Sequence, residues 1–280
     1  SFKTGEKVFD WTIPEVWECK DAYIIDPDGK KIVDLKKNNL HVVNYSIPVE
    51  MNVTLKKLKK NLYFLKNHSD AIPYVTSYYK KTWGFCLTFN QFKKLKEGTY
   101  KIKIDSSFKQ GELFVSEAYL KGDSNKEIFF STYTCHPSMA SNELSGPLIS
   151  MFLYLCLSKV KKRKYSYRFL FSAETIGTIA YLSKRYKTLK KNMIGGYVLT
   201  CLGDDKPFNY KNSKNINSLV NDVAQYHLKK SKNGLQTIYD FFPTGSDERQ
   251  YCSQGIDLPV GCITRSMYGK FKEYHTSKDN

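Results

Sequence analysis

The second half of the chain alternates short apolar runs with longer helical patterns, and this alternation constrains the fold more than any other feature. From Glu127 on, the sequence predicts helices over 147–159 and 177–186, and strands at 128–130, 167–171, 197–201 and 258–263. Strands that alternate with helices form a mostly parallel or mixed sheet covered on both faces. In such sheets the functional loops follow the carboxyl ends of the strands. We therefore predict an α/β catalytic domain over 123–280, with its site at that edge.

The first part of the chain has a different pattern. Turn signals at 27–29, 96–98 and 109–111 separate short alternating runs that are rich in aromatic and β-branched residues. Such runs predict antiparallel strands. One helix is expected among them, capped by Thr54, with leucines at helical spacing at 55, 58, 62 and 65. We predict that residues 1–122 form a smaller, inserted β-rich domain.

Composition limits the class of protein. The 280 residues include 44 Lys and Arg against 27 Asp and Glu, a formal net charge of +17. The lysines are scattered over helical and connecting segments, so we interpret them as solvated and do not expect a nucleic-acid partner. Seven cysteines form no Cys-x-x-Cys pair, which is typical of a reduced, cytoplasmic protein. No apolar run reaches the roughly 20 residues of a membrane span, so no membrane partner is expected. The oligomeric state stays open.

A histidine follows the first strand of the second half, in Cys135-His136-Pro137-Ser138. The proline disfavours a helical backbone at His136 and fixes the imidazole in an extended turn. A histidine held in this way is either a metal ligand or a structural residue satisfied by local hydrogen bonds. Glu143 follows near the start of the next helix, where it is either a ligand or part of a capping loop.

Carboxylates follow two further strands. Glu174 comes directly after an apolar run, where partial desolvation would raise its pKa and let it take a proton from a metal-activated water. Alternatively, it only stabilises the start of a helix. Asp247, Glu248 and Arg249 precede the last strand. The two acids would bind a substrate amine or a metal, and the arginine a substrate carboxylate, unless all three are merely solvated.

A second candidate ligand lies near residue 280, in Tyr274-His275-Thr276. Asp279 follows, and a carboxylate beside a histidine is the arrangement that orients metal-binding imidazoles. The other histidines, His41, His68 and His227, lack such neighbours, and we expect them to be structural or surface residues.

Read in order, these motifs resemble those of the zinc-dependent aminopeptidases with a phosphorylase/hydrolase-like α/β fold. The chain is most similar to a branch sometimes labelled polysaccharide biosynthesis proteins, through the segments CHPS, NELSGP, ETIG, GSDERQYCS and EYHTS-DN. The resemblance covers nearly the whole chain, because the segments around Trp11 and Trp83 are similar to an extra domain of that branch. It implies a zinc-exopeptidase-like fold, with Glu174 as the water-activating base and His136 and His275 as metal ligands.

The chain departs from the family pattern at three carboxylate positions. Asn142 stands where the two-zinc enzymes have a bridging aspartate, and Thr175 and Thr200 replace two more acidic ligands. The loss of three anionic ligands does not suit two divalent cations. We therefore expect one zinc ion per chain, with Glu143 as the third ligand and Asp247 as the second choice.

The expected function is hydrolysis of an amide bond in a small peptide-like or amino-sugar-like substrate, assisted by the metal. The site side chains are expected to be exposed at the strand ends. Two alternatives stay open: an amide-modifying or acyl-transfer enzyme of glycan or secondary-metabolite assembly, and a non-catalytic binding module on a decayed enzyme fold. The residues expected to contact the substrate are Asp247, Glu248, Arg249, Tyr274 and Asn142.

Overall fold

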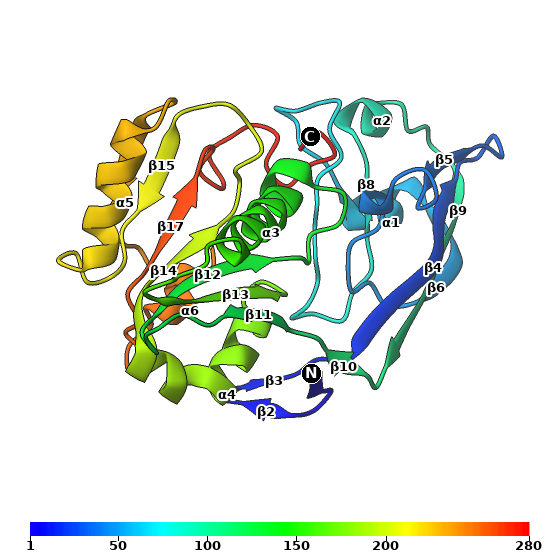
Figure 1. Ribbon diagram of the computed structural model, residues 1–280. Coiled ribbons are helices and arrows are strands. Elements are labelled where there is room, and N and C mark those ends of the chain that lie inside the picture. Colours follow the sequence, from blue (N-terminus) through cyan, green and yellow to red (C-terminus); the bar gives the residue numbers. More distant parts are fainter. Residues whose placement is uncertain (280) are drawn as a thin grey trace. The chain divides into compact units, whose positions relative to one another are not determined.

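The computed structural model describes residues 1–279 (Figure 1). Asn280, the last residue of the EYHTS-DN segment, lies outside the described residues. The chain divides into two compact units, each built from several segments. The first comprises Ser1–Pro14, Glu112–His136 and Ala140–Phe271, and the second comprises Glu15–Gly111, Pro137–Met139 and the chain from Lys272 on. This division differs from the expected boundary at Gly122, because both 1–14 and 112–122 belong to the first unit.

The first unit contains a seven-stranded mixed sheet with the order β11-β13-β12-β14-β17-β15-β16. Four central strands, β13, β12, β14 and β17, are parallel, whereas β11 and β15 each run antiparallel to a neighbour. The predicted mixed α/β sheet is thus confirmed. The strands are β11 (Ser116–Leu120), β12 (Glu127–Tyr133), β13 (Ser166–Ser172), β14 (Met193–Leu199), β15 (Phe208–Lys211), β16 (Leu235–Tyr239) and β17 (Val260–Thr264).

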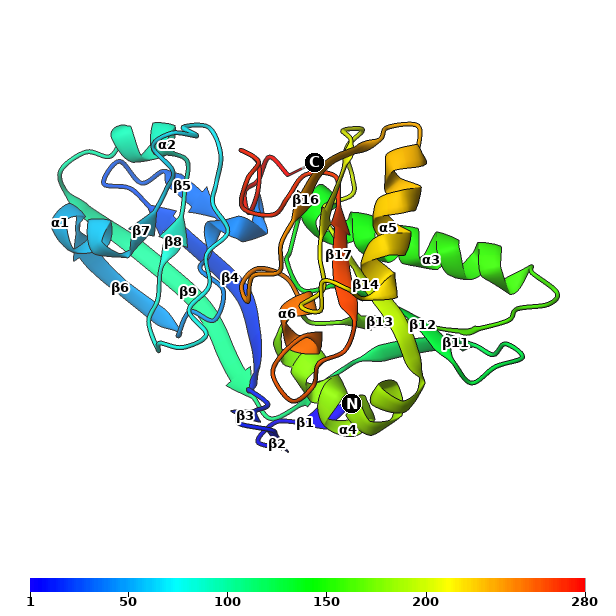
Figure 2. The same cartoon turned by 90° about the vertical axis from the view of Figure 1, so that its left-hand side faces the viewer.

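Helices cover both faces of this sheet, with α3 and α5 on one side and α4 and α6 on the other (Figure 2). The helices are α3 (Ser145–Ser158), α4 (Ile176–Asn192), α5 (Leu219–Lys230) and α6 (Glu248–Tyr251), and a π-helical turn (Ala140–Leu144) precedes α3. Covered on both faces, β12, β13 and β14 each bury five of their seven residues, and each contains a short apolar run.

The amino-terminal residues belong to the first unit because they pack on α4. Phe2, Val8 and Ile13 form a buried cluster with Ile179 and Ala180 of that helix. The segment forms three two-residue strands, of which the first pairs with β10 and the other two with each other. These strands are β1 (Phe2–Lys3), β2 (Lys7–Val8), β3 (Trp11–Thr12) and β10 (Glu112–Leu113).

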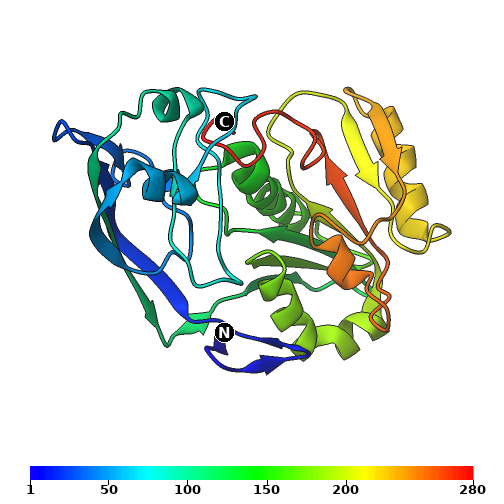
Figure 3. The ribbon, with the colours of Figure 1, turned by 180° about the vertical axis from the view of Figure 1, so that it is seen from behind.

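The second unit is built on a four-stranded antiparallel sheet with the order β5-β4-β9-β6, in which β4 and β9 are the long strands (Figure 3). One face of the sheet and the short helices enclose an apolar core. The elements are β4 (Val16–Ile25), β5 (Lys31–Asp34), β6 (Val49–Thr54), α1 (Leu55–Leu58), β7 (Leu62–Tyr63), β8 (Phe85–Cys86), α2 (Phe89–Lys93), β9 (Thr99–Lys109) and 3₁₀ turns at Asn39–His41 and Lys59–Asn61.

The helix predicted from Thr54 is much shorter than expected. It ends at Leu58, and the Thr54 side chain makes no capping hydrogen bond. Leu62 instead lies in β7, opposite Phe85 of β8. The leucine spacing was misleading because Leu55, Leu58 and Leu62 all enter one core from two different elements.

Among residues 1–279, no helix is both long enough and apolar enough to cross a membrane.

Candidate functional site

Three of the predicted site residues lie together in the first unit: His136, Glu143 and Glu174. His136 follows β12 and Glu174 follows β13, and these two strands are parallel neighbours, so their loops leave the same edge of the sheet. Glu143 lies in the π-helical turn before α3. Turns of this type are rare and occur frequently at functional sites.

Glu143 fixes the position of His136. Its carboxylate accepts hydrogen bonds from the backbone N–H of Cys135, from the backbone N–H of His136 at 2.9 Å and from His136 Nδ1 at 2.8 Å. Because Nδ1 donates to the carboxylate, Nε2 carries the lone pair whenever the ring is neutral. A carboxylate on one nitrogen is the arrangement that orients a metal-binding histidine and raises its basicity.

Glu174 faces the other nitrogen of the same ring. Its Oε2 atom lies 3.6 Å from His136 Nε2. This distance is too long for a hydrogen bond. Burial, together with the charge of Asp247, raises the pKa of Glu174. Burial lowers the pKa of His136, but the hydrogen bond and charge of Glu143 outweigh this effect and raise it.

Residues at the start of α6 hold the loop that carries Glu174. Asp247 is fully buried and accepts hydrogen bonds from Thr175 N and Thr178 Oγ1, both at 2.8 Å. Arg249 donates to Thr175 Oγ1 at 2.7 Å. Thr175 has φ +64°, which is an outlier for a β-branched residue, and these contacts hold it there. Backbone strain of this kind is concentrated at functional sites.

Burial also raises the pKa of Asp247, while the bonds from Thr175 and Thr178 oppose the shift. The buried Asp247 and the partly buried Glu174 therefore disfavour each other's charge in the absence of a cation.

A neutral hydrogen-bond network contains Asn142 and Thr200, the residues that the resemblance aligned with carboxylate positions of the two-zinc enzymes. Tyr133 OH lies 2.6 Å from Thr200 Oγ1. The Thr200 hydroxyl donates to the backbone carbonyl of Asn142 at 3.0 Å. The Asn142 amide points toward Cys201 Sγ at 3.4 Å. Both Asn142 and Thr200 are buried. Neutral groups that bond to one another do not supply the negative charge that a second divalent cation needs.

One group of side chains at this site could hold a metal ion. Among residues 1–279, Cys135, His136 and Glu143 form the single group of metal-ligating side chains, with their ligand atoms within 4.8 Å of one another. The sequence analysis assigned no role to Cys135, although it adjoins His136. Burial and the charges of Glu143 and Glu174 raise the pKa of the Cys135 thiol well above its usual value. The thiol is thus protonated in the metal-free protein.

The whole chain, residues 1–280, matches the family model described as Domain of unknown function (DUF4910). The chain belongs to the DUF4910 family. A protein of Clostridium acetobutylicum is 48% identical over 278 residues and is named a polysaccharide biosynthesis protein with an aminopeptidase-like domain. The alignment covers 99% of the DUF4910 chain and 63% of that relative. The chain thus spans less than two thirds of the relative's length.

Solved structures show the same fold. A crystal structure of a peptidase-named protein of Clostridium acetobutylicum matches with TM-score 0.95 and 48% identity, over 100% of this chain and 65% of that one. A zinc aminopeptidase of Bacillus subtilis matches with TM-score 0.67 at 11% identity, over 96% and 78% of the two chains. The DUF4910 chain therefore has an aminopeptidase-like fold, which confirms the predicted resemblance.

The other predicted site residues of this DUF4910 chain make contacts within their own units. Glu248 is fully buried and lies 2.7 Å from Lys211 Nζ, with Tyr268 OH donating to it at 2.9 Å. His275 and Tyr274 belong to the second unit, where their rings stack with centroids 3.9 Å apart. The substrate roles of Asp247, Glu248, Arg249, Tyr274 and Asn142, and the ligand role of His275, stay predictions.

The expectation that the site side chains are exposed was wrong. The side chains of His136 and Glu143 are 7% and 5% exposed, that of Glu174 is 23% exposed, and Asp247 is fully buried. The reason is that the loops after β12 and β13 contact each other: the Glu174 N–H donates to Cys135 Sγ at 3.2 Å.

Proposed function

We propose that this protein is a metal-dependent hydrolase of the aminopeptidase-like class, which cleaves an amide bond in a small peptide-like or amino-sugar-like substrate. The observation that carries the proposal is the position of His136, held through Nδ1 by Glu143 and facing Glu174 through Nε2. The names given to the Clostridium matches, a peptidase and a polysaccharide biosynthesis protein, support the two substrate classes.

Each residue of the cluster has a separate task in this proposal. Glu143 positions His136, and His136 Nε2 binds the metal. Glu174 accepts the proton of the attacking water, and its raised pKa brings its proton affinity closer to that of a base operating at neutral pH. Asp247 and Arg249 hold the loop that carries Glu174. When bound, a zinc ion supplies Lewis-acid polarisation of the amide carbonyl.

Metal content per chain tests the first part of the proposal. Elemental analysis of the wild type, purified without chelator, is expected to give about one zinc per chain. His136→Ala should lose the ion, and His227→Ala, which changes an exposed histidine of α5, should retain it. His275→Ala in parallel tests the ligand role predicted for that residue. Failure of the wild type to take up added zinc would contradict the proposal.

Turnover tests the second part. Glu174→Gln should keep the zinc and lose at least about a hundredfold in turnover of aminoacyl anilides or N-acyl amino sugars, because the general base is gone. Chelator should abolish wild-type turnover, and zinc should restore it. Turnover that is unaffected by Glu174→Gln would contradict the role of Glu174, and turnover that is unaffected by chelator would contradict metal dependence.

A further inference from the structure

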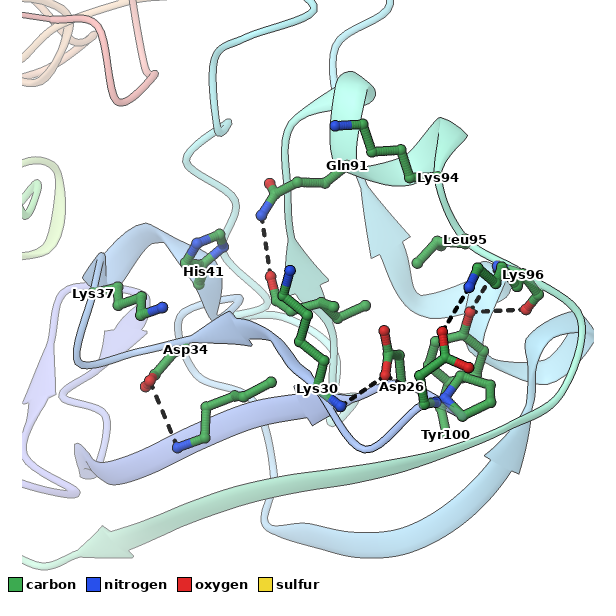
Figure 4. Close-up of a pocket in the computed structure, with 14 residues that line it drawn as sticks. Asp26, Lys30, Asp34, Lys37, His41, Gln91, Lys94, Leu95, Lys96 and Tyr100 are labelled. Carbon is green, nitrogen blue, oxygen red and sulfur yellow. Dashed lines mark hydrogen bonds and ion pairs between the residues drawn. The ribbon is translucent and has the colours of Figure 1, made fainter.

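The second unit contains a groove of about 490 Å³ that is separate in sequence from the cluster around His136 (Figure 4). All of its lining residues lie within Glu15–Gly111. They come from the turn between β4 and β5, from β5 itself, from the segment that leads into the Asn39–His41 turn, and from α2 with the residues after it.

The groove is positively charged. Five lysines and three aspartates line it, namely Lys30, Lys31, Lys37, Lys94, Lys96, Asp26, Asp28 and Asp34. Two of the lysines are neutralised by aspartates: Lys96 lies 2.6 Å from Asp28, and Lys31 lies 3.6 Å from Asp34. The ion pairs between residues 1–279 include none for the other three. Figure 4 shows Lys37 beside His41 and Lys30 between that pair and Asp26, so the two lysines come from different parts of the lining. These ammonium groups are therefore available to an anion.

The same groove also presents hydrogen-bond acceptors. His41 is largely buried, and its Nδ1 lies 2.7 Å from the carbonyl oxygen of Cys86. A carbonyl oxygen can only accept, so Nδ1 donates, and Nε2 of the neutral ring is an acceptor. Burial lowers the pKa of His41, which keeps the ring neutral at physiological pH. The carboxylates of Asp26 and Asp34 add further acceptors at the same wall. Such acceptors match hydroxyl donors.

We propose that this groove binds an anionic carbohydrate, with Lys30 and Lys37 contacting its acidic group and His41 accepting a hydrogen bond from one of its hydroxyls. A simple inorganic anion would use the lysines but leave the acceptors unmatched. A neutral sugar would leave the lysines without a role. A nucleic-acid backbone would bring phosphates close to the three aspartates, which costs Coulomb energy. A sugar that bears a carboxylate or a phosphate satisfies both sets of groups.

Calorimetric titration with five probes tests this site: trigalacturonate, glucose 6-phosphate, maltotriose, inorganic phosphate and a single-stranded oligonucleotide. The decisive variant is Lys30→Ala/Lys37→Ala. Its matched control is Lys60→Ala/Lys66→Ala, which removes the same charge from two exposed lysines of the same unit outside the groove. Both double variants change exposed or half-exposed side chains, so both are expected to fold.

We expect trigalacturonate or glucose 6-phosphate to bind the wild type at least about tenfold more tightly than maltotriose or inorganic phosphate, because only these two offer both kinds of group. The groove variant should lose about tenfold in affinity, and the control should change less than about twofold. The two charged sugars distinguish carboxylate from phosphate recognition.

Four results would overturn the proposal: no binding of either charged sugar at millimolar concentration, equal losses in both double variants, inorganic phosphate binding as tightly as the charged sugars, or a single-stranded oligonucleotide binding more tightly than either sugar. Zinc content and turnover are measured on the same variants. Both should be unchanged, so failure here is distinguishable from failure of the proposed hydrolase.

Discussion

Glu174 is a buried carboxyl whose removal should affect stability and activity in opposite directions. Its folded-state pKa is raised, so the folded protein binds more protons than the unfolded chain once the pH exceeds the ordinary value for Glu. The stability that protonation provides is therefore complete at low pH and is lost as the pH rises toward the raised pKa. In chelator, Glu174→Gln should increase the free energy of unfolding by on the order of 1 kcal/mol at pH 8 and by much less at pH 5.

Urea denaturation at the two pH values measures this difference. Glu97→Gln, which changes an exposed carboxyl of the second unit, should show no pH-dependent difference from the wild type. An equal effect of Glu174→Gln at pH 5 and pH 8 would show that burial does not disfavour the Glu174 charge.

At the scale of elements, α3 packs on the sheet through Gly146. A Cβ atom there would clash with the Leu199 carbonyl oxygen of β14 and with Thr132 Oγ1 of β12. Gly146→Ala should therefore destabilise the protein by about 1–3 kcal/mol, because the helix must move off the sheet. Leu148→Ala, on the exposed side of the same helix, should cost less than about 0.5 kcal/mol in the same thermal or chemical denaturation. Similar small effects for both would contradict the close approach.

A buried ion pair connects β15 with α6. Lys211 and Glu248 are both fully buried, and Lys211 Nζ also contacts the Thr244 carbonyl and the ring of Phe242. Removal of one partner leaves the other charge buried and unpaired. Lys211→Met should therefore lower the free energy of unfolding by about 3–5 kcal/mol. The double variant Lys211→Met/Glu248→Gln should recover much of that loss. A double-mutant cycle in urea measures the coupling, and additive losses would contradict it.

The elements differ in how far the sequence predicts them. The strands β12, β13, β14 and β17 were predictable because they are buried on both faces and each contains a short apolar run. The region that contains β15, α5 and β16 was not, because lysine, asparagine and serine interrupt its short apolar stretches. Among the candidate site residues, His136 and Glu174 were predicted from their positions after strands, and Glu143 from its position before a helix. The ion pair of Glu248 with Lys211 was not predictable, because Lys211 lies 37 residues away on one of the unpredicted strands.

At the scale of the whole molecule, the second unit has a core of its own. Its main apolar cluster lies between Ala22 and Ile104, and all four strands of its sheet lie within Glu15–Gly111. We expect this segment, expressed alone, to fold cooperatively. It should be less stable than in the whole chain, because Met139, which packs with Leu40 and Ile72, is absent.

Circular dichroism melting would measure the cooperativity and stability of the 15–111 segment, and amide NMR dispersion would show whether it is folded. A shorter segment, residues 15–98, lacks β9, the strand paired with both β4 and β6, and should be unfolded. A disordered 15–111 segment would show that its core depends on the remainder of the chain.

The amino-terminal segment has a consequence for the order of events during synthesis. Ile13 packs against Ile179, so 166 residues separate partners of one apolar cluster. At about 5–20 residues per second, the ribosome synthesises α4 roughly 10–30 s after residues 1–14, which pack against it. Meanwhile the chain between them can complete the sheet of the second unit. This segment is thus covered only after α4 has been made, and during that interval Phe2, Val8 and Ile13 are the natural contacts for a chaperone.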